Sequence, residues 1–530
     1  VVPPAVRFGY VENGRYKTLS FHVRNTSQNA CIVSTLELGR GSSPEITLPK
    51  PIALPATILP GGTLEVPVRL SPKVNAEYQG TVEFAINSLH FPQASVGVSG
   101  TSKDGCLLVA PNDIDFGVNK VNCSSRERTF TVYNTCATTV NLSGIDVQAG
   151  LSNEFRVTQR PVLPYALTSG SSVEFKAVYR PTDVGTDAGS IAVQTLQLSH
   201  PYVVSVSGTG ATDAVQTDIF AQDARPKMDI LFVVDDSGSM SDKQTSLGAN
   251  FDAFMKYAQS QGVDFHIAVT STSVCTSNTC GSSKASNGRF APEQPLDFPS
   301  PAERVITPTS ANASQLFSRN VNVGTSGNGD EQALEAAARA LSQNRLGNHN
   351  AGFLRPDAYL AIVFVTDTYD QSPQTTAYYY NYFLSVVGFR RANELSISGI
   401  IPTSAGPTST CSYDETTASM QSTRLRNIIT QSGGLFDNIC TPDWSKTLEA
   451  IGQRIFGYKT RFFLTNTPDL SPTVEPMRVY VNNVERPATG PQGDVRWTYD
   501  SVTNSINFDP LAAPEPGDTL KVVYTVACVP

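Results

Sequence analysis

An internal repeat constrains the fold of this chain more than any other feature of its sequence. Phe8 and Phe116 each precede a glycine and lie 108 positions apart, and Gly100 and Gly208 are separated by the same distance. Both copies, 1–105 and 106–211, alternate apolar and polar residues, with turn residues about every 8–12 positions. This pattern predicts two all-β sandwich domains in tandem.

The closing strands make the repeat more specific. The first copy closes on VGVSGTS at 96–102 and the second on VVSVSGTG at 203–210. This arrangement resembles the ASH/MSP-like immunoglobulin-type domains, which are also called choice-of-anchor D modules. The resemblance implies two Ig-like sandwiches that act as spacers or binding modules rather than as enzymes.

A different pattern begins after a polar connector at 212–226. The apolar runs MDILFVV at 228–234 and LAIVFVTD at 360–367 are typical of strands in a parallel sheet that is covered on both faces. Helical periodicity follows the first run, and a strong helix is expected at 330–344. Alternating strands and helices over 226–457 predict a doubly wound α/β (Rossmann-like) domain. Period-2 alternation returns at 458–530, which predicts a small C-terminal all-β domain.

Composition excludes several classes of protein. The 530 residues include 39 Lys and Arg and 47 Asp and Glu, for a net charge of −8, and only 16% of residues are charged. Because phosphate contacts need clustered basic residues, this balance argues against nucleic-acid binding. No apolar run approaches the roughly 18 residues of a transmembrane helix. The low charge and the Ser, Thr and Asn content are more typical of exported β proteins than of cytosolic enzymes.

The nine cysteines predict disulfides rather than a metal–thiolate site, because no Cys-x-x-Cys pair is present. Cys123 and Cys136 flank one strand of the second repeat, where a disulfide would clip that strand to its neighbour. Pairs Cys275–Cys280 and Cys411–Cys440 would close loops of the α/β domain. No partner is assigned to Cys31, Cys106 or Cys528. The opening VVPPAVRFGY suggests a processed chain whose removed segment was a secretion signal or a lipoprotein anchor.

Oxygen-bearing side chains gather where the predicted parallel strands end. Asp235, Ser237 and Ser239 follow the first strand as Asp-x-Ser-x-Ser, and Asp367 ends the strand at 360–367. Thr325 lies in a Gly-Thr loop before the strong helix. Ligands of open α/β sheets bind at the carboxyl ends of strands. Carboxylates and hydroxyls are hard ligands, which suit Mg²⁺, Ca²⁺ or Mn²⁺.

This order of motifs resembles a von Willebrand factor type A (vWA) domain with its metal-ion-dependent adhesion site, the MIDAS. The resemblance implies that Asp235, Ser237, Ser239, Thr325 and Asp367 surround the cation, and that a carboxylate of a partner fills its open position. The loop after Thr325 is longer than usual, so Asn328 or Glu331 is an alternative to Thr325. Asp370 is a rival of Asp367.

The sequence therefore predicts metal-dependent adhesion, without catalysis, to a protein or surface that presents a carboxylate. The whole arrangement resembles exported myxobacterial-type surface lipoproteins, which implies an extracellular or cell-surface location and, in a Gram-negative host, the outer-membrane exterior. Two alternatives stay open: a structural subunit of a surface appendage or envelope complex, and a metal-dependent hydrolase. No general base beside the metal is evident for the hydrolase. The tyrosine run at 378–382 is either packed or part of a binding face.

Overall fold

The computed structural model describes the chain except residues 2–4, 89–91, 104, 150–153, 198–199, 223–226, 275–303, 328–329, 343–345, 347–348, 356–357, 404–422, 458, 510–511, 516 and 529–530. Contacts divide the chain into two compact units. The first comprises Val1–Gln216, Thr465–Glu475 and Tyr524–Pro530, and the second comprises Thr217–Leu464 and Pro476–Val523. None of the described helices is long and apolar enough to cross a lipid bilayer.

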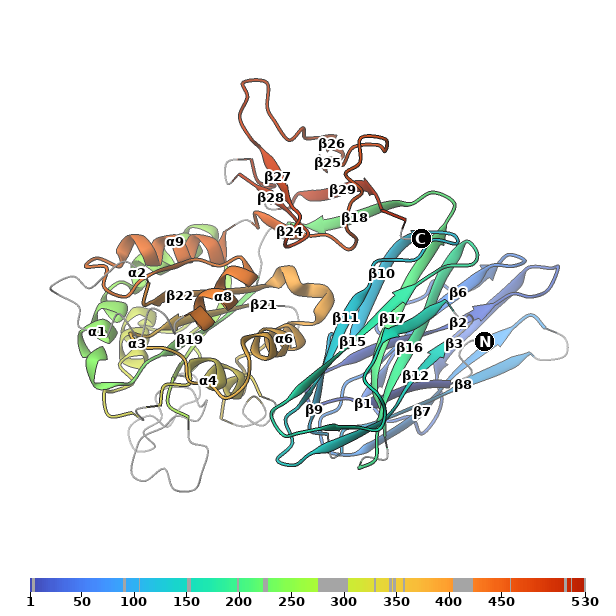
Figure 1. Ribbon diagram of the computed structural model, residues 1–530, viewed down its shortest axis with the longest axis horizontal. Helices are drawn as coiled ribbons and strands as arrows, with labels where there is room; N and C mark the ends of the chain where they lie inside the picture. The colour runs from blue at the N-terminus through green and yellow to red at the C-terminus, as the bar shows by residue number, and fades with distance from the viewer. Residues whose placement is uncertain are drawn as a thin grey trace. The chain divides into compact units, whose positions relative to one another are not determined.

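The first repeat folds into a sandwich of two sheets around one core. Strands in the order β1-β8-β7-β3-β5 form one sheet and β2-β6-β4 form the other (Figure 1). Phe8 from the first sheet and Phe21 from the second are fully buried in the shared core. The strands are β1 (Ala5–Tyr10), β2 (Lys17–Arg24), β3 (Cys31–Leu38), β4 (Ile46–Thr47), β5 (Ala56–Ile58), β6 (Thr63–Leu70), β7 (Glu77–Ile86) and β8 (Gln93–Thr101).

The second repeat has the same plan with one strand more. Sheet β10-β17-β16-β12-β14 packs against β13-β15-β11-β9, and Phe116 is fully buried between them as Phe8 is in the first repeat. The Asn25 and Asn134 side chains each donate two hydrogen bonds to main-chain carbonyls at the same point of the two sandwiches. The strands are β9 (Leu107–Ala110), β10 (Asp113–Lys120), β11 (Arg128–Asn134), β12 (Val140–Ala149), β13 (Phe155–Gln159), β14 (Tyr165–Leu167), β15 (Ser172–Tyr179), β16 (Gly185–Thr195) and β17 (Tyr202–Ala211).

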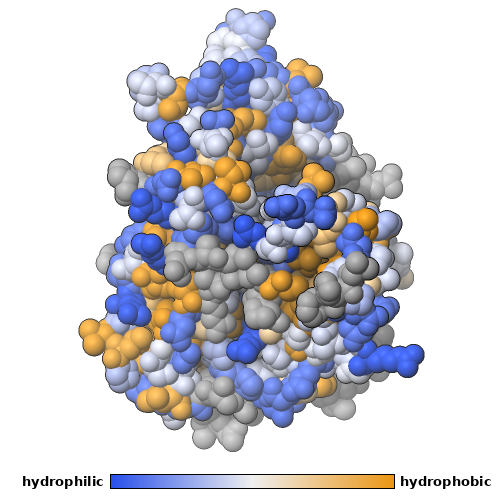
Figure 2. Space-filling view, turned by 90° about the vertical axis from the view of Figure 1, so that its right-hand side faces the viewer, coloured by the Kyte–Doolittle hydropathy of each residue, from blue (hydrophilic) through white to orange (hydrophobic). Residues whose placement is uncertain are grey.

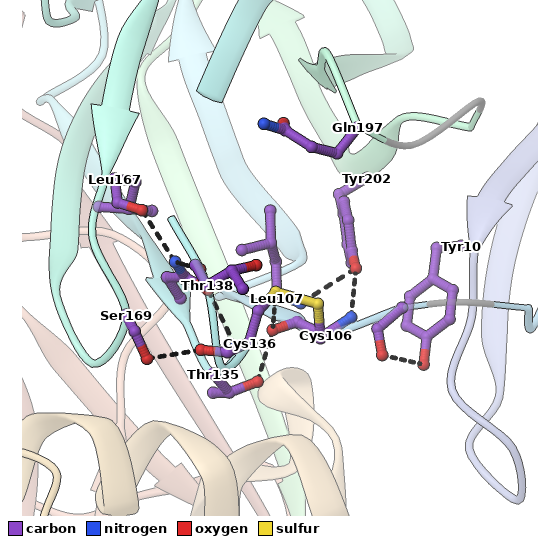
Figure 3. Close-up of a disulfide and its surroundings, with 12 residues drawn as sticks. Tyr10, Cys106, Leu107, Thr135, Cys136, Thr138, Leu167, Ser169, Gln197 and Tyr202 are labelled. Carbon is purple, nitrogen blue, oxygen red and sulfur yellow. Dashed lines mark hydrogen bonds between the residues drawn. A yellow bond between two sulfur atoms is a disulfide. The ribbon is translucent and has the colours of Figure 1, made fainter. Parts of the chain in front are cut away.

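Disulfides in the first unit differ from those expected. Cys136 pairs with Cys106, and Cys123 pairs with Cys528, so the predicted link between Cys123 and Cys136 is wrong. Figure 3 shows the Cys106–Cys136 disulfide beside Tyr202, whose hydroxyl accepts a hydrogen bond from the Cys106 amide at 2.9 Å. Cys31 is a free thiol. Cys440 is disulfide-bonded, whereas Cys275, Cys280 and Cys411 lie outside the described residues.

The second unit contains a five-stranded parallel sheet in the order β20-β19-β21-β22-β23. The first strand along the chain, β19, lies between β20 and β21, and all of its residues after Lys227 are buried. This burial explains its continuous apolar sequence. The strands are β19 (Lys227–Val234), β20 (Asp264–Ser271), β21 (Tyr359–Val365), β22 (Leu395–Ile401) and β23 (Phe436–Asn438).

Helices cover both faces of this sheet (Figure 1). Ile230 and Phe232 of β19 pack into one core with residues of α1, α2, α3 and α9, and α4, α6 and α8 lie against the sheet separately from that core. The single helix expected after β19 is broken at Asn250, although its apolar residues are buried as predicted. The helices are η1 (Gly238–Met240), α1 (Ser241–Ala249), α2 (Phe251–Gln261), α3 (Ala313–Val321), α4 (Ala333–Ala340), α6 (Thr376–Val387), η3 (Phe389–Glu394), α8 (Thr423–Ser432) and α9 (Ser445–Phe456).

The segment at 212–226 is not simply a connector, because it contains a strand that pairs near the other end of the chain. Strand β18 adjoins β29 in the sheet β18-β29-β25-β26, and a second small sheet has the order β24-β28-β27 (Figure 1). The α/β segment therefore lies between two strands of one sheet. These strands are β18 (Val215–Ala221), β24 (Arg461–Phe463), β25 (Arg478–Val481), β26 (Val484–Glu485), β27 (Trp497–Asp500), β28 (Ser505–Phe508) and β29 (Thr519–Thr525).

Candidate metal centre

The two aspartates expected at the strand ends both lie at the carboxyl edge of the parallel sheet. Asp235 follows β19 directly, and Asp367 follows β21 after one residue. The Asp235 amide donates to the Val365 carbonyl at 2.9 Å, and the Thr366 hydroxyl donates to Asp235 Oδ2 at 2.6 Å. The neighbouring strands β19 and β21 therefore bring together residues that are more than a hundred positions apart in the sequence.

The first loop places hydroxyls at the surface above a buried carboxylate. Asp235 is fully buried, and its Oδ1 accepts a hydrogen bond from the Ser237 amide at 2.7 Å. The Ser237 and Ser239 hydroxyl oxygens lie 3.2 Å apart, with Ser239 exposed. Burial raises the pKa of Asp235, although hydrogen bonds from Thr366 and Ser237 oppose the rise.

Lys243 of α1 is the buried cation closest to Asp367 in the described structure. Its Nζ lies 4.0 Å from Asp367 Oδ2 and donates to the Ser239 carbonyl at 3.3 Å. Burial and the charge of Asp235 together raise the pKa of Asp367 to about 6, although the hydrogen bond from Ser239 and the charge of Lys243 oppose the rise. Asp367 Oδ2 is buried without a hydrogen-bond partner.

The second loop approaches the centre through its main chain. The Gln244 side-chain amide donates to the carbonyls of Gly324 and Asp235 at 2.7 and 2.8 Å, which ties this loop to the first. Gly327 donates its amide to the Asp236 carbonyl at 2.9 Å. Thr325 is exposed on the loop, and Asn328 lies outside the described residues.

Two further carboxylates, of Asp236 and Glu331, join Asp235 in a buried group. One oxygen-ligand atom from each of the three residues lies within 4.8 Å of the others. The Ser273 hydroxyl donates to Asp236 Oδ1 at 2.7 Å, and the Thr272 hydroxyl donates to Glu331 Oε2. Burial raises the pKa of Asp236 to about 6 and, with the charge of Asp235, that of Glu331 to about 9.

Sequence reasoning ranked Glu331 only as an alternative and did not use Asp236 at all. Asp236 occupies the variable position of Asp-x-Ser-x-Ser, where nothing in the motif indicates the direction of the side chain. Glu331 lies two residues before α4, where an acidic residue is ordinarily explained by the helix dipole. The sequence offered one signal for Asp236, because it directly follows Asp235 at the end of a buried strand, and buried Asp and Glu are rare without a partner.

The rival residue and the tyrosine run have structural roles. Asp370 Oδ1 accepts hydrogen bonds from the Leu334 amide, at the start of α4, and from the Ser372 hydroxyl. Its other oxygen lies 3.1 Å from Arg424 Nε.

The tyrosines at 378–380 and 382 are buried on α6, so they do not form a binding face.

The donor set at this centre fits a hard divalent cation. Carboxylates of Asp235 and Asp367 and hydroxyls of Ser237 and Ser239 supply only oxygen, which excludes a preference for soft metals. The buried Oδ2 of Asp367 has no hydrogen-bond partner, as expected of an atom that a cation would contact. Together these residues can hold a cation at the end of the sheet with its outer side toward solvent.

Comparisons with known proteins give low similarity throughout. No family model matches the chain, and no curated protein matches it. Among solved structures, a PapD-like (ASH) domain of human CEP192 is 16% identical, with a TM-score of 0.17, over 20% of this chain and 85% of that one. The MSP family member WR4 of C. elegans is 11% identical, with a TM-score of 0.15, over 20% and 99%. Proximal thread matrix protein 1 from the mussel byssus is 13% identical, with a TM-score of 0.24, over 45% and 47%.

Proposed function

We propose that this protein is a metal-dependent adhesion protein whose α/β segment is a vWA domain with a MIDAS-type site. The proposal is carried by one observation: the Asp-x-Ser-x-Ser loop after β19 and the aspartate after β21 meet at one edge of the parallel sheet, through the hydrogen bond from Thr366 to Asp235. Ligands of open α/β sheets bind at this edge, outside the carboxyl ends of the strands.

Each residue at the site would make a different contact with the cation. Asp235 would hold the cation from below, with its carboxylate oriented by Ser237 and Thr366. Ser237 and Ser239 would contribute neutral oxygens at the surface. A bound Mg²⁺, Ca²⁺ or Mn²⁺ supplies an open coordination position that a carboxylate from a partner protein or surface can fill. Lys243 beside Asp367 reduces the net negative charge that such a carboxylate would meet.

The proposed location is outside the cell or on its surface. The described residues contain the disulfides Cys106–Cys136 and Cys123–Cys528, which form and persist in oxidising compartments. The two sandwiches would then act as a stalk or as binding modules, as their Ig-like form suggests. A lipid anchor preceding the chain would be compatible with this location.

The decisive experiment is capture of a partner from envelope extract with the immobilised full chain. Capture should require added Mg²⁺ or Ca²⁺, disappear in EDTA and return when the cation is restored. The Asp235→Ala variant should capture nothing under any of these conditions. The matched control is Asp213→Ala, since Asp213 is exposed and lies outside the α/β segment. Capture that is indifferent to both EDTA and Asp235→Ala would rule out adhesion through this site.

The same experiment separates adhesion from a fixed structural role in an appendage or envelope complex. A structural subunit would keep its partner after EDTA treatment, and large apolar patches on the β modules would favour this role. On the face shown in Figure 2, hydrophobic residues instead form small groups between hydrophilic ones. That view gives the structural alternative no specific support.

A further inference from the structure

The charges around the proposed site are unevenly compensated. Four buried carboxylates belong to Asp235, Asp236, Glu331 and Asp367, and the buried ammonium of Lys243 faces only the last of them. Among the ion pairs of the described residues, none reaches Asp236 or Glu331. Because a buried carboxylate is costly without a proton or a cation, this side of the centre lacks its counter-charge.

The geometry of the uncompensated side suits a cation. The ligand atoms of Asp235, Asp236 and Glu331 lie within 4.8 Å of one another, and two oxygens on one Ca²⁺ lie at most about 5 Å apart. Glu331 is only 2% exposed, and its Oε1 has no hydrogen-bond partner. Its Oε2 and Asp236 Oδ1 are held by Thr272 and Ser273, so the carboxylates are already oriented.

This group shares Asp235 with the ligand set of the proposed adhesion site, for which Glu331 is also an alternative to Thr325, and it differs from that set in its other residues. That set reaches the surface through Ser237 and Ser239 and includes Asp367, which is not part of the three-carboxylate group. We propose that Asp236 and Glu331, sharing Asp235 with the outer site, hold a second divalent cation of the calcium type. Adhesion is not required for this inner position, so either proposal can fail alone.

The inner cation would order the loop between α3 and α4. Glu331 forms a β-bridge with Ser273, Gln332 donates its amide to the Thr272 carbonyl at 3.1 Å, and Gly327 donates to the Asp236 carbonyl. These contacts join the loop to the ends of β19 and β20. A cation between Asp236 and Glu331 would strengthen the same junction, and it would hold the loop that carries Thr325 beside the outer site.

Counting bound ions in the full chain tests the proposal. Chelator-treated wild type, titrated with CaCl₂ by calorimetry and checked by equilibrium dialysis, should bind two Ca²⁺ per chain. Glu331→Gln and Asp236→Asn should each bind one, or bind the second at least tenfold more weakly. Ser239→Ala should instead weaken the outer ion and leave the inner one. The matched control is Asp330→Asn, because Asp330 is exposed next to Glu331.

A melting experiment guards against misfolded variants. In EDTA, Glu331→Gln should melt at the wild-type temperature or above it, because it removes a buried unpaired carboxylate of nearly the same shape. Its rise in melting temperature on adding CaCl₂ should be smaller than that of wild type. One ion per chain in wild type, or two ions retained in both Glu331→Gln and Asp236→Asn, overturns the inner position. If wild type binds two ions but captures no partner in the presence of Ca²⁺ or Mg²⁺, only the adhesion proposal is overturned.

Discussion

Arg355→Met should destabilise the second unit strongly, because it leaves the buried carboxylate of Asp229 without its cation at the amino-terminal end of the parallel sheet. Asp229 of β19 is fully buried, and it accepts hydrogen bonds from Arg355 Nε at 2.8 Å and from the Arg355 amide at 2.6 Å. The same guanidinium contacts Asp264, which is half exposed and adds at most about 1 kcal/mol. Removing one partner of a buried pair costs about 3–5 kcal/mol, and we expect that loss at pH 8.

The loss should depend on pH in a direction that the burial of Asp229 fixes. Burial raises the pKa of Asp229 to about 7, opposed by Arg355, while His266 Nδ1 lies 3.8 Å from its Oδ1 and Asp264 raises the pKa slightly. A raised carboxyl pKa means that the folded state binds the proton more tightly between about pH 4 and 7. The stabilisation by that proton is present at low pH and is lost as pH rises through about 7. Arg355→Met should therefore cost only about 1–2 kcal/mol at pH 5, where Asp229 is protonated.

Urea denaturation followed by tryptophan fluorescence measures the free energy of unfolding of the second unit, which this prediction concerns. Both tryptophans of the chain, Trp444 and Trp497, belong to the second unit, and Trp444 is 3% exposed in the core of the α/β segment. The double variant with Asp229→Asn should recover much of the stability lost by Arg355→Met at pH 8. A loss below 1 kcal/mol at pH 8, or equal losses at pH 5 and pH 8, would refute the reasoning.

Three further predictions follow from other contacts. Gly327→Ala should weaken Ca²⁺ binding, because the added Cβ would lie 2.3 Å from Asp236 Oδ1 and 2.6 Å from Ser273 Oγ and would displace the carboxylate; unchanged calorimetry would contradict this. Replacing Cys123 and Cys528 by Ser opens a loop of 405 residues and should lower the stability of the second sandwich by up to about 6 kcal/mol in the chain-entropy model. Hydrogen exchange of β10 measures that loss, and unchanged protection would argue against it. Asn134→Ala removes two main-chain contacts and should cost about 2–4 kcal/mol by urea denaturation, whereas a cost near zero would mean that water replaces the amide.

The sandwiches and the strand-end aspartates were accessible from the sequence, because the first depend on a repeated spacing and the second on continuous apolar runs. Phe8 and Phe116 repeat at a fixed spacing and are equally buried, as a duplicated core requires. Asp235 and Asp367 end continuous apolar runs, and parallel strands carry their carboxyl ends to one edge. The order of strands within the sheet did not have to be known, because either neighbour of β19 would have presented its end there.

The residues that the sequence did not reveal depend on side-chain direction or on long-range pairing. Asp236 accepts a hydrogen bond from Ser273, which follows another strand, and no spacing rule reports the direction of such a side chain. Cys123 was paired with its neighbour in sequence, whereas its actual partner arrives from the far end of the chain. Cysteine spacing cannot specify such a connection, since the number of pairings grows steeply with the number of cysteines.

The pairing of β18 with β29 sets an order of events during synthesis. Strand β18 emerges from the ribosome at Val215–Ala221, but its neighbour β29 is translated only with Thr519–Thr525. The two sandwich cores and the parallel sheet can form from earlier residues, while β18 presents an unpaired edge until β29 has been made. The Cys123 thiol likewise stays unpaired until Cys528 has been translated. Residues 519–528 thus complete both the sheet and the disulfide, so a nascent chain that stops before them keeps a free Cys123 thiol and an open strand edge for quality control to recognise.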